Sequence, residues 1–286
     1  MANINFDRLY DFAAGPPGGV GAGFRVGDGD PMALRINFTI EKADTETPNT
    51  ARITLWNLNP QQRAILNEKD CMVTLRAGYK RGHIAQVCVG TIVYVKTTMD
   101  GGDRETIMEI YDGRIPLRDT YVTLSYSGVV NTRRIIEDTA AEMGVAVTFS
   151  YNARFADFPN GFSFVGPGRV ALDKACATSG LQWQISNGVL QVKNGRDTMN
   201  REAYVLSPET GLIGIPKRIT YGEDGVGVGE QPGWEVTYLL NGAINVSDFV
   251  RLESKVVTGF FRVKWIEMKG DNHRGRWICT VRLIYA

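Results

Sequence analysis

The sequence predicts a mainly β protein of the α+β class, in which two small β-barrel domains flank a small α/β domain. In the first ~115 residues and again in the last third of the chain, apolar and polar residues alternate with a period of two. Such alternation is typical of strands with one solvated face. Between these regions, from ~120 to ~195, two short segments have helical spacing and a glycine at the end of each.

The N-terminal barrel domain is predicted over residues 1–118. Its first two strands are marked by alternating apolar residues, which are Leu34, Ile36, Phe38 and Ile40 in one and Ala51, Ile53 and Leu55 in the other. Asn59 can cap a short helix that begins at Pro60, because proline suits the first helical turn. Further strands are expected at 71–79, 83–100 and 104–113, with a hairpin tip at Asp100–Asp103.

The α/β domain is predicted over residues 119–200. A helix is expected from about Asn131 to Gly144, followed by a strand and a loop that contains Gly166 and Pro167. A second helix then ends at Gly180. The stretch 181–192 reads as a hairpin, because Asn187–Gly188 suits a type I′ turn.

The C-terminal barrel domain is predicted over residues 201–286. Its expected strands alternate between apolar and polar residues, and glycines or short polar turns separate them. They lie near 219–221, 234–240, 249–254, 259–271 and 275–286. The two outer domains have similar length and strand texture, although no literal repeat is present.

Two glycine-rich segments are predicted to be loops or arms. Gly15–Gly23 contains two adjacent prolines, which oppose a regular helix or a central strand. Tyr221–Gly233 contains a GxGxG pattern, but it precedes a strand. A phosphate-binding loop would need a helix N-terminus at that point, so neither segment is interpreted as a nucleotide site.

Charge and composition exclude several classes of protein. The 32 basic residues nearly balance the 31 acidic ones, so the net charge of +1 provides no global attraction to DNA or an anionic membrane. We see no signal peptide and no apolar stretch long enough to span a bilayer, and we expect synthesis in the cytoplasm. The four cysteines are expected to be buried thiols; they are Cys71, Cys88, Cys176 and Cys279.

No motif in the sequence points to catalysis, a cofactor or a metal ion. His83 and His273 lie alone in turn-like segments, and Ser127 belongs to no nucleophile motif. The carboxylate pairs all lie among glycines in expected turns; they are Asp28/Asp30, Asp100/Asp103 and Glu223/Asp224. A weak calcium site at Asp28–Asp30 is disfavoured because the loop lacks EF-hand spacing. We therefore predict a protein without enzymatic activity.

Basic residues occur singly on the predicted strands, with aromatic residues between them. They are Arg35, Arg52, Arg76, Arg262, Lys264 and Arg282, and the aromatics are Trp56, Phe261, Trp265 and Trp277. A continuous basic stripe with stacked aromatics would suggest nucleic-acid binding. We favour the simpler interpretation, in which core aromatics alternate with a solvated basic face.

A series of short motifs, taken in order, resembles the baseplate central hub proteins of contractile-tailed phages. In the N-terminal domain they are Asn57-Leu58-Asn59, Gly78-Tyr79, Gly90-Thr91-Ile92 and Asp112-Gly113. In the middle domain they are the helices around Ile135-Ile136 and Leu172–Cys176 and the hairpin at Leu181–Ile185. In the C-terminal domain, Ser247-Asp248 stands where the family usually has Gly-Asp, and both pairs suit a tight turn.

The resemblance implies a structural role in the virion. Such hubs are homotrimeric rings in which two tail-tube-like barrels per chain create pseudo-sixfold symmetry between the tail tube and the central spike. Implied partners are therefore the central spike protein, the tail tube or its initiator, and other baseplate proteins. DNA or the tape-measure protein would pass through the lumen without specific binding. Gly15–Gly23 and Tyr221–Gly233 are the candidate contacts with neighbours.

Two alternatives remain open at this point. One is a receptor- or glycan-binding β module of the tail tip, and the other is a different tail-tube or tail-tip structural protein. A glycan hydrolase is less favoured, since it would need two carboxylates converging in a cleft.

Overall fold

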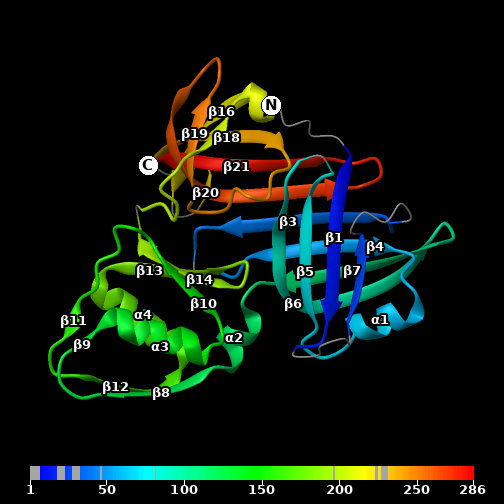
Figure 1. The fold of residues 1–286 in the computed structure, drawn as a ribbon. Helices are drawn as coiled ribbons and strands as arrows, with labels where there is room; N and C mark the ends of the chain where they lie inside the picture. The colour runs from blue at the N-terminus through cyan, green and yellow to red at the C-terminus, as the bar shows by residue number, and fades with distance from the viewer. Residues whose placement is uncertain are drawn as a thin grey trace.

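The computed structural model describes residues 7–17, 23–27, 33–45, 47–80, 82–195, 197–222, 225–226 and 231–286. It confirms a mainly β fold with a few short helices. In Figure 1 the helices of the middle segment lie together at the lower left, and the strands from both ends of the chain fill the rest of the molecule. Within the described ranges, no helix combines the length and the apolar character needed to cross a bilayer.

The N-terminal segment contains every strand predicted for it and three further elements. The elements are β1 (Arg8–Gly15), β2 (Phe24–Gly27), β3 (Ile36–Ala43), β4 (Thr50–Trp56), α1 (Pro60–Leu66), β5 (Met72–Tyr79), β6 (Ile84–Asp100), β7 (Asp103–Tyr111) and α2 (Arg114–Asp119). Strands β1 and β2 and helix α2 were not expected. The side chain of Asn59 caps α1 by accepting from the N–H of Gln62 at 2.8 Å, as predicted.

The middle segment has its own apolar core between two helices and a small sheet. Its elements are β8 (Tyr121–Tyr126), β9 (Val130–Asn131), α3 (Thr132–Glu142), β10 (Ala146–Phe149), β11 (Asp157–Phe158), β12 (Phe162–Pro167), α4 (Gly168–Ser179), β13 (Leu181–Ser186) and β14 (Val189–Asn194). The expected loop at Gly166 and Pro167 is wrong, because both residues belong to β12, which pairs with β8. Positive φ angles at Asn187 (53°) and Gly188 (76°) confirm the predicted hairpin turn.

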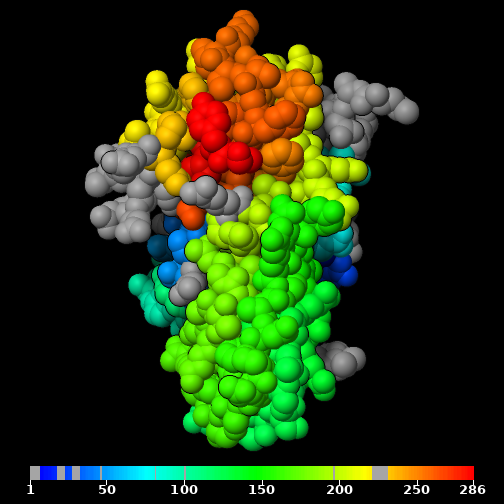
Figure 2. Space-filling model, turned by 90° about the vertical axis from the view of Figure 1, so that its left-hand side faces the viewer, coloured from blue at the N-terminus to red at the C-terminus, as the bar shows by residue number. Residues whose placement is uncertain are grey.

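The C-terminal segment is again built of strands. Its elements are β15 (Tyr204–Leu206), the 3₁₀ turn η1 (Pro208–Thr210), β16 (Leu212–Gly222), β17 (Gly225–Val226), β18 (Gln231–Leu239), β19 (Phe249–Glu253), β20 (Thr258–Asp271) and β21 (Trp277–Tyr285). Figure 2 shows its outer strands, in orange and red, above the green middle segment, which projects downward.

One sheet of 14 strands joins the two ends of the chain. Its main path runs β17-β16-β18-β21-β20-β3-β4-β7-β6-β5-β1-β2, and off this path β19 pairs with β20 and β15 pairs with β19. The central link is the antiparallel pair β20–β3, in which Met268 lies opposite Ile40 and Gly270 opposite Phe38. One apolar core follows this sheet through both outer segments. Closure of each outer segment into a barrel stays a prediction.

Gly270 is a point of close approach between the two outer segments. A Cβ atom at this position would lie 2.2 Å from Cζ of Phe38, whose side chain is buried against Trp277. We expect Gly270→Ala to lower the free energy of unfolding by about 1–3 kcal/mol, the usual cost of overpacking. Thermal unfolding followed by circular dichroism measures the change.

Gly195→Ala is the matched control for this substitution. Its added Cβ would meet the end of the flexible Gln182 side chain at 3.3 Å, so a small shift can accommodate it. Equal melting temperatures for the two variants would contradict the proposed tight contact at Gly270.

Candidate functional site

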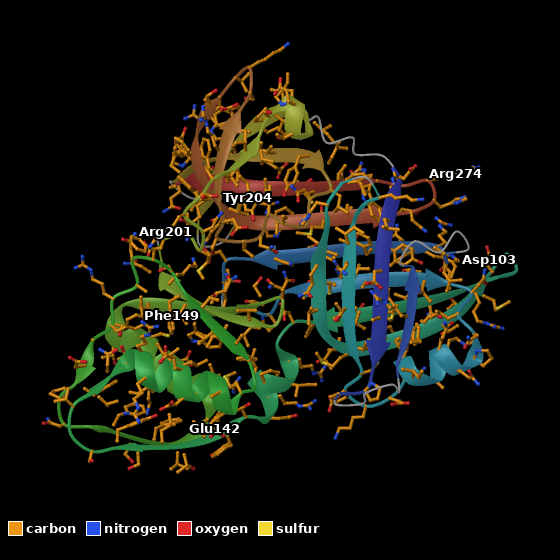
Figure 3. All side chains as sticks on the ribbon, in the orientation of Figure 1. Asp103, Glu142, Phe149, Arg201, Tyr204 and Arg274 are labelled. Atoms are coloured by element: carbon orange, nitrogen blue, oxygen red, sulfur yellow. The ribbon has the colours of Figure 1, made fainter. Side chains whose placement is uncertain are left out.

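The residues singled out by sequence for possible chemistry do not converge. His83, His273 and Ser127 are exposed and lie in separate turns. Asp103 projects at the tip of the β6–β7 hairpin, far from the middle segment (Figure 3), where it accepts from Asn57 Nδ2 at 3.0 Å. The pairs Asp28/Asp30 and Glu223/Asp224 lie outside the described residues.

The four cysteines are free and buried, as predicted. Burial raises the pKa of Cys88 and of Cys279 to about 12, so both thiols stay protonated at neutral pH. Among the described residues, no three His, Cys, Asp or Glu side chains are grouped closely enough to hold a metal ion.

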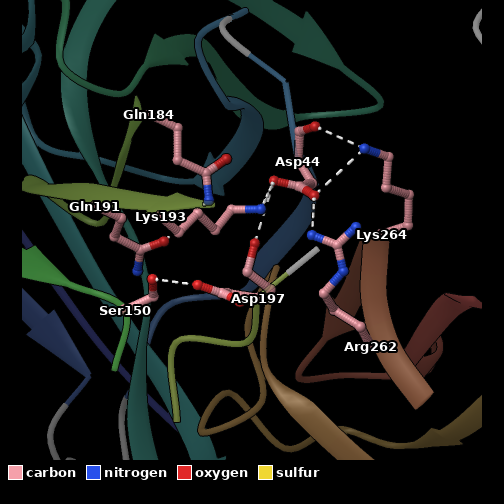
Figure 4. A network of polar contacts seen from close by, with 9 residues as sticks. Asp44, Ser150, Gln184, Gln191, Lys193, Asp197, Arg262 and Lys264 are labelled. Carbon is pink, nitrogen blue, oxygen red and sulfur yellow. Dashed lines mark hydrogen bonds and ion pairs between the residues drawn. The ribbon is translucent and has the colours of Figure 1, made fainter. Parts of the chain in front are cut away.

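The most concentrated polar chemistry surrounds Asp44, which directly follows β3. Three cations from two other segments converge on its carboxylate (Figure 4). Lys193 Nζ on β14 lies 2.7 Å from Oδ1, and on β20 Arg262 Nη1 lies 3.0 Å and Lys264 Nζ 3.3 Å from Oδ2. We call these four residues the Asp44 junction, because they connect the N-terminal, middle and C-terminal segments.

The junction keeps its carboxylate ionised despite burial. Burial alone would raise the pKa of Asp44, but the charges of Lys193, Lys264 and Arg262 outweigh it and hold the pKa below its usual value. Burial also lowers the pKa of Lys193 to about 8, although Asp44 opposes this shift. The side chains of Lys193 and Asp44 are 2% and 4% exposed, so solvent screens their interaction only weakly.

Ser247 completes the contacts of the Asp44 carboxylate. Its hydroxyl donates to Oδ1 at 3.2 Å, and its own φ of 67° is in the left-handed region that favours glycine. A glycine would adopt this conformation without the steric cost of a Cβ atom. The serine here adds a hydrogen bond that glycine cannot make.

A second buried contact inserts the β13–β14 turn into the N-terminal segment. Lys42 Nζ on β3 donates to Asn187 Oδ1 at 2.8 Å and to Asn245 Oδ1 at 2.9 Å. The backbone N–H groups of Asn187 and Gly188 donate to the carboxylate of Asp112, at 2.5 and 3.0 Å. The tip of the middle segment is therefore held by side chains from both outer segments.

Asp248 lies beside this second contact. The pH dependence of stability tests whether its carboxyl is buried there. Burial raises its pKa to about 7, against the opposing effects of the Asn245 N–H and of Lys42. Because the pKa of this carboxyl is higher in the folded state than in the unfolded state, the free energy of unfolding is highest below the pKa of the unfolded state. It falls as the pH rises toward 7. From pH 4 to pH 8 we therefore expect the wild type to lose stability relative to Asp248→Asn.

We expect the wild type to lose on the order of 2 kcal/mol of unfolding free energy relative to the variant. This is less than the full pKa shift would give, because the Asp248 carboxyl is partly exposed. Asparagine keeps an oxygen that can accept from the Asn245 N–H, which the wild type binds at 2.7 Å. Urea unfolding at pH 4, 6 and 8 measures the difference. Parallel pH profiles for the two proteins would show that Asp248 ionises normally.

The prediction of a solvated basic face is wrong for part of β20. Arg262 is buried in the Asp44 junction, and Lys264 is mostly covered there, because the middle segment packs against this part of the strand. Other basic residues do lie on aromatic rings, with Arg35 4.3 Å from Trp56 and Arg282 4.1 Å from the Trp265 ring.

Sequence reasoning missed the Asp44 junction, and no local signal could have revealed it. Asp44 occurs in a polar stretch that reads as an ordinary turn, and its partners lie about 150 and 220 positions further along the chain. The alternation of Arg262 and Lys264 with apolar residues is the same pattern that a solvated strand face produces.

The fold has clear relatives among solved structures. A tail protein of prophage MuSo2 from Shewanella oneidensis matches with a TM-score of 0.64 and 9% identity, over 97% of this chain and 98% of that one. A tail protein from Neisseria meningitidis MC58 matches with a TM-score of 0.60 and 11% identity, over 96% of each chain. At these identities the similarity establishes the fold alone.

A third relative is the Escherichia coli c3393 protein, described as a component of the type VI secretion system with structural similarity to phage T4 tail proteins gp27 and gp5. It matches with a TM-score of 0.59 and 9% identity, over 91% of this chain and 76% of that one.

No curated protein matches by sequence. The family model described as "Baseplate hub gp41" matches residues 20–260, which is most of the chain. The chain therefore belongs to the baseplate hub gp41 family, and it is a structural component of a phage tail baseplate.

Proposed function

We propose that three copies of this hub protein form a ring with pseudo-sixfold symmetry. The observation that carries the proposal is the β3–β20 pair, which joins two strand-rich outer segments edge to edge within one chain. Two comparable segments per chain, repeated by a threefold axis, present six similar units to a hexameric tube. Head-to-tail contacts of this kind close into a ring when the rotation between copies allows it.

The two ends of the sheet are the proposed contacts between copies. Strands β2 and β17 end the hydrogen-bonded path. Strand β2 directly follows the glycine-rich segment Gly15–Gly23, and β17 lies within the segment Tyr221–Gly233. An edge strand in a monomer leaves backbone groups unpaired, so a neighbouring copy would satisfy them. These segments lie partly outside the described residues, and their role as contacts is part of the proposal.

The proposed ring connects the tail tube, or a tube initiator, to the central spike and to other baseplate proteins. Its lumen would let DNA or the tape-measure protein pass without gripping it, in keeping with the near-neutral charge of the chain. The function would be mechanical rather than enzymatic. Synthesis in the host cytoplasm and assembly into the virion follow from the same role.

We also propose that the outer barrel domains comprise residues 1–118 and 201–286, with residues 119–200 between them. Two separate apolar cores support this division, since one runs through both outer segments and the other lies within the middle segment. The middle segment would then face outward from the ring, where it cannot obstruct the lumen.

The first experiment is the mass of the purified protein by light scattering across concentration, with negative-stain images of any oligomer. The proposal predicts a mass near three times the 31.6 kDa of one chain and a ring with a central hole. If the protein stays monomeric at high concentration, even with its spike partner added, the ring proposal is wrong.

A further inference from the structure

A polar hollow of about 680 Å³ opens in the middle segment. Residues 151–154, which follow β10, form one part of its lining, and the rest comes from the end of α4, the start of β13 and the end of β14. Its lining residues include Tyr151, Asn152, Arg154, Ser179, Leu181 and Asn194. Figure 3 labels Phe149, the last residue of β10, and Arg201 on the left-hand side of the molecule.

The loop that lines the hollow is fixed at both ends. The Ser150 N–H donates to the carbonyl of Val192 at 2.9 Å, and the Ser150 hydroxyl donates to Asp197 at 2.8 Å. Further along the chain, the Ala156 N–H donates to Ser179 Oγ at 3.2 Å. These contacts hold the lining in place before a ligand arrives, so binding would require little ordering of the chain.

Three lining side chains have polar groups available to a ligand. The guanidinium of Arg154 and the amides of Asn152 and Asn194 make no hydrogen bond or ion pair with any residue that the structure describes. The described residues that line the hollow include no carboxylate that could neutralise Arg154. The hollow therefore combines one uncompensated positive charge with two amides that can each donate and accept hydrogen bonds.

Tyr151 adds an aromatic surface to this polar lining. It is 70% exposed, and the guanidinium of Arg201 lies 3.6 Å from the centroid of its ring. This cation–π contact restrains the ring while much of it stays open to solvent. An open aromatic surface beside polar groups suits a ligand that carries both C–H and O–H groups.

We propose that this hollow binds a carboxylated saccharide. Sugar hydroxyls both donate and accept hydrogen bonds, as the amides of Asn152 and Asn194 do. A carboxylate matches the planar donor fork of Arg154, and the C–H groups of a sugar ring match the surface of Tyr151. A mainly polar hollow fits such a hydrated ligand better than an apolar one, which would need an apolar lining. The site lies within one chain, so the proposal does not depend on the ring.

The test probe is the hyaluronan tetrasaccharide, in which glucuronic acid alternates with N-acetylglucosamine. A ligand-observed NMR titration of the full chain at pH 7 should show saturable binding with a Kd below about 10 mM. Arg154→Gln should weaken this binding at least tenfold, because it removes both the charge and the donor fork. Its melting temperature should equal that of the wild type, since Arg154 has no partner among the described residues.

Arg169→Gln is the matched control. Arg169 is also exposed, but it lies at the start of α4, the end opposite Ser179, so this variant should bind as the wild type does. Tyr151→Ala is a second test of the site, and the loss of the aromatic surface should also weaken binding at least tenfold. The neutral N-acetylglucosamine tetramer, which lacks the carboxylate, should bind at least tenfold more weakly than the acidic tetrasaccharide.

Four results would overturn the proposal. They are the absence of saturable binding, unchanged affinity in both Arg154→Gln and Tyr151→Ala, an equal loss in Arg169→Gln, and equal affinity for the neutral tetramer. A capped Gly-Glu-Gly peptide supplies a carboxylate without a sugar and should bind at least tenfold more weakly. If the peptide binds as tightly as the saccharide, the saccharide proposal is wrong and the hollow is a docking site for an acidic side chain of a partner protein.

Discussion

Replacing Asp44 by asparagine is expected to lower the free energy of unfolding by about 3–5 kcal/mol, the usual cost of removing one partner from a buried charged network. The reason is that Lys193 and Arg262 are almost fully buried and would lose the carboxylate that compensates them. Asparagine preserves the size of the side chain, so the change isolates the charge. Urea unfolding at pH 7, followed by circular dichroism, measures the loss.

Asp119→Asn is the control for this variant, because the Asp119 carboxylate makes an exposed ion pair with Arg118. Exposed pairs contribute little, so we expect a much smaller change than for Asp44→Asn. The pKa of Asp44 lies below its usual value, so its contribution is present above pH ~4 and is lost as pH falls through the folded pKa. The difference between wild type and Asp44→Asn should therefore shrink below pH 4, and a constant difference down to pH 2 would argue against the ion pairs as its cause.

Trp277→Ala is the second substitution with a large expected effect, about 3–5 kcal/mol of unfolding free energy. Trp277 on β21 is 2% exposed and connects the two outer segments. Its ring packs edge to face on Phe38 at 5.4 Å, and its indole N–H donates to the carbonyl of Gly78 at 3.2 Å. Truncation would leave a cavity and remove this hydrogen bond at the interface between the segments.

Two further variants separate these contributions in denaturant unfolding. Trp277→Phe keeps most of the apolar contact and loses the hydrogen bond, so we expect a loss of about 1–2 kcal/mol. Trp265→Ala on β20 removes a partly exposed ring that lies under Arg282, and we expect a smaller loss than for Trp277→Ala. Equal losses for the two alanine variants would show that Trp277 has no special role in joining the segments.

Local patterns were sufficient for most elements of the fold. The alternation in β3 and β4, the Asn59 cap of α1 and the Asn187–Gly188 turn are all short-range effects, and the structure confirms them. Strand β1 was missed because its sequence, RLYDFAAG, lacks clear alternation and leads into a glycine-rich stretch. It is a strand because β5 pairs with it along its whole length, a tertiary contact.

The sequence by itself determined the fold class, the order of the three segments, the buried thiols and the resemblance to baseplate hubs. Each of these depends on residue types and on spacings of a few positions. The tertiary structure alone decided that β3 pairs with β20, and that Lys193 and Arg262 meet at Asp44. The physical reason is that periodicity reports which face of a strand is apolar, whereas the choice of a distant partner depends on how whole segments pack. A charged residue that is buried by such packing has the same local sequence pattern as an exposed one.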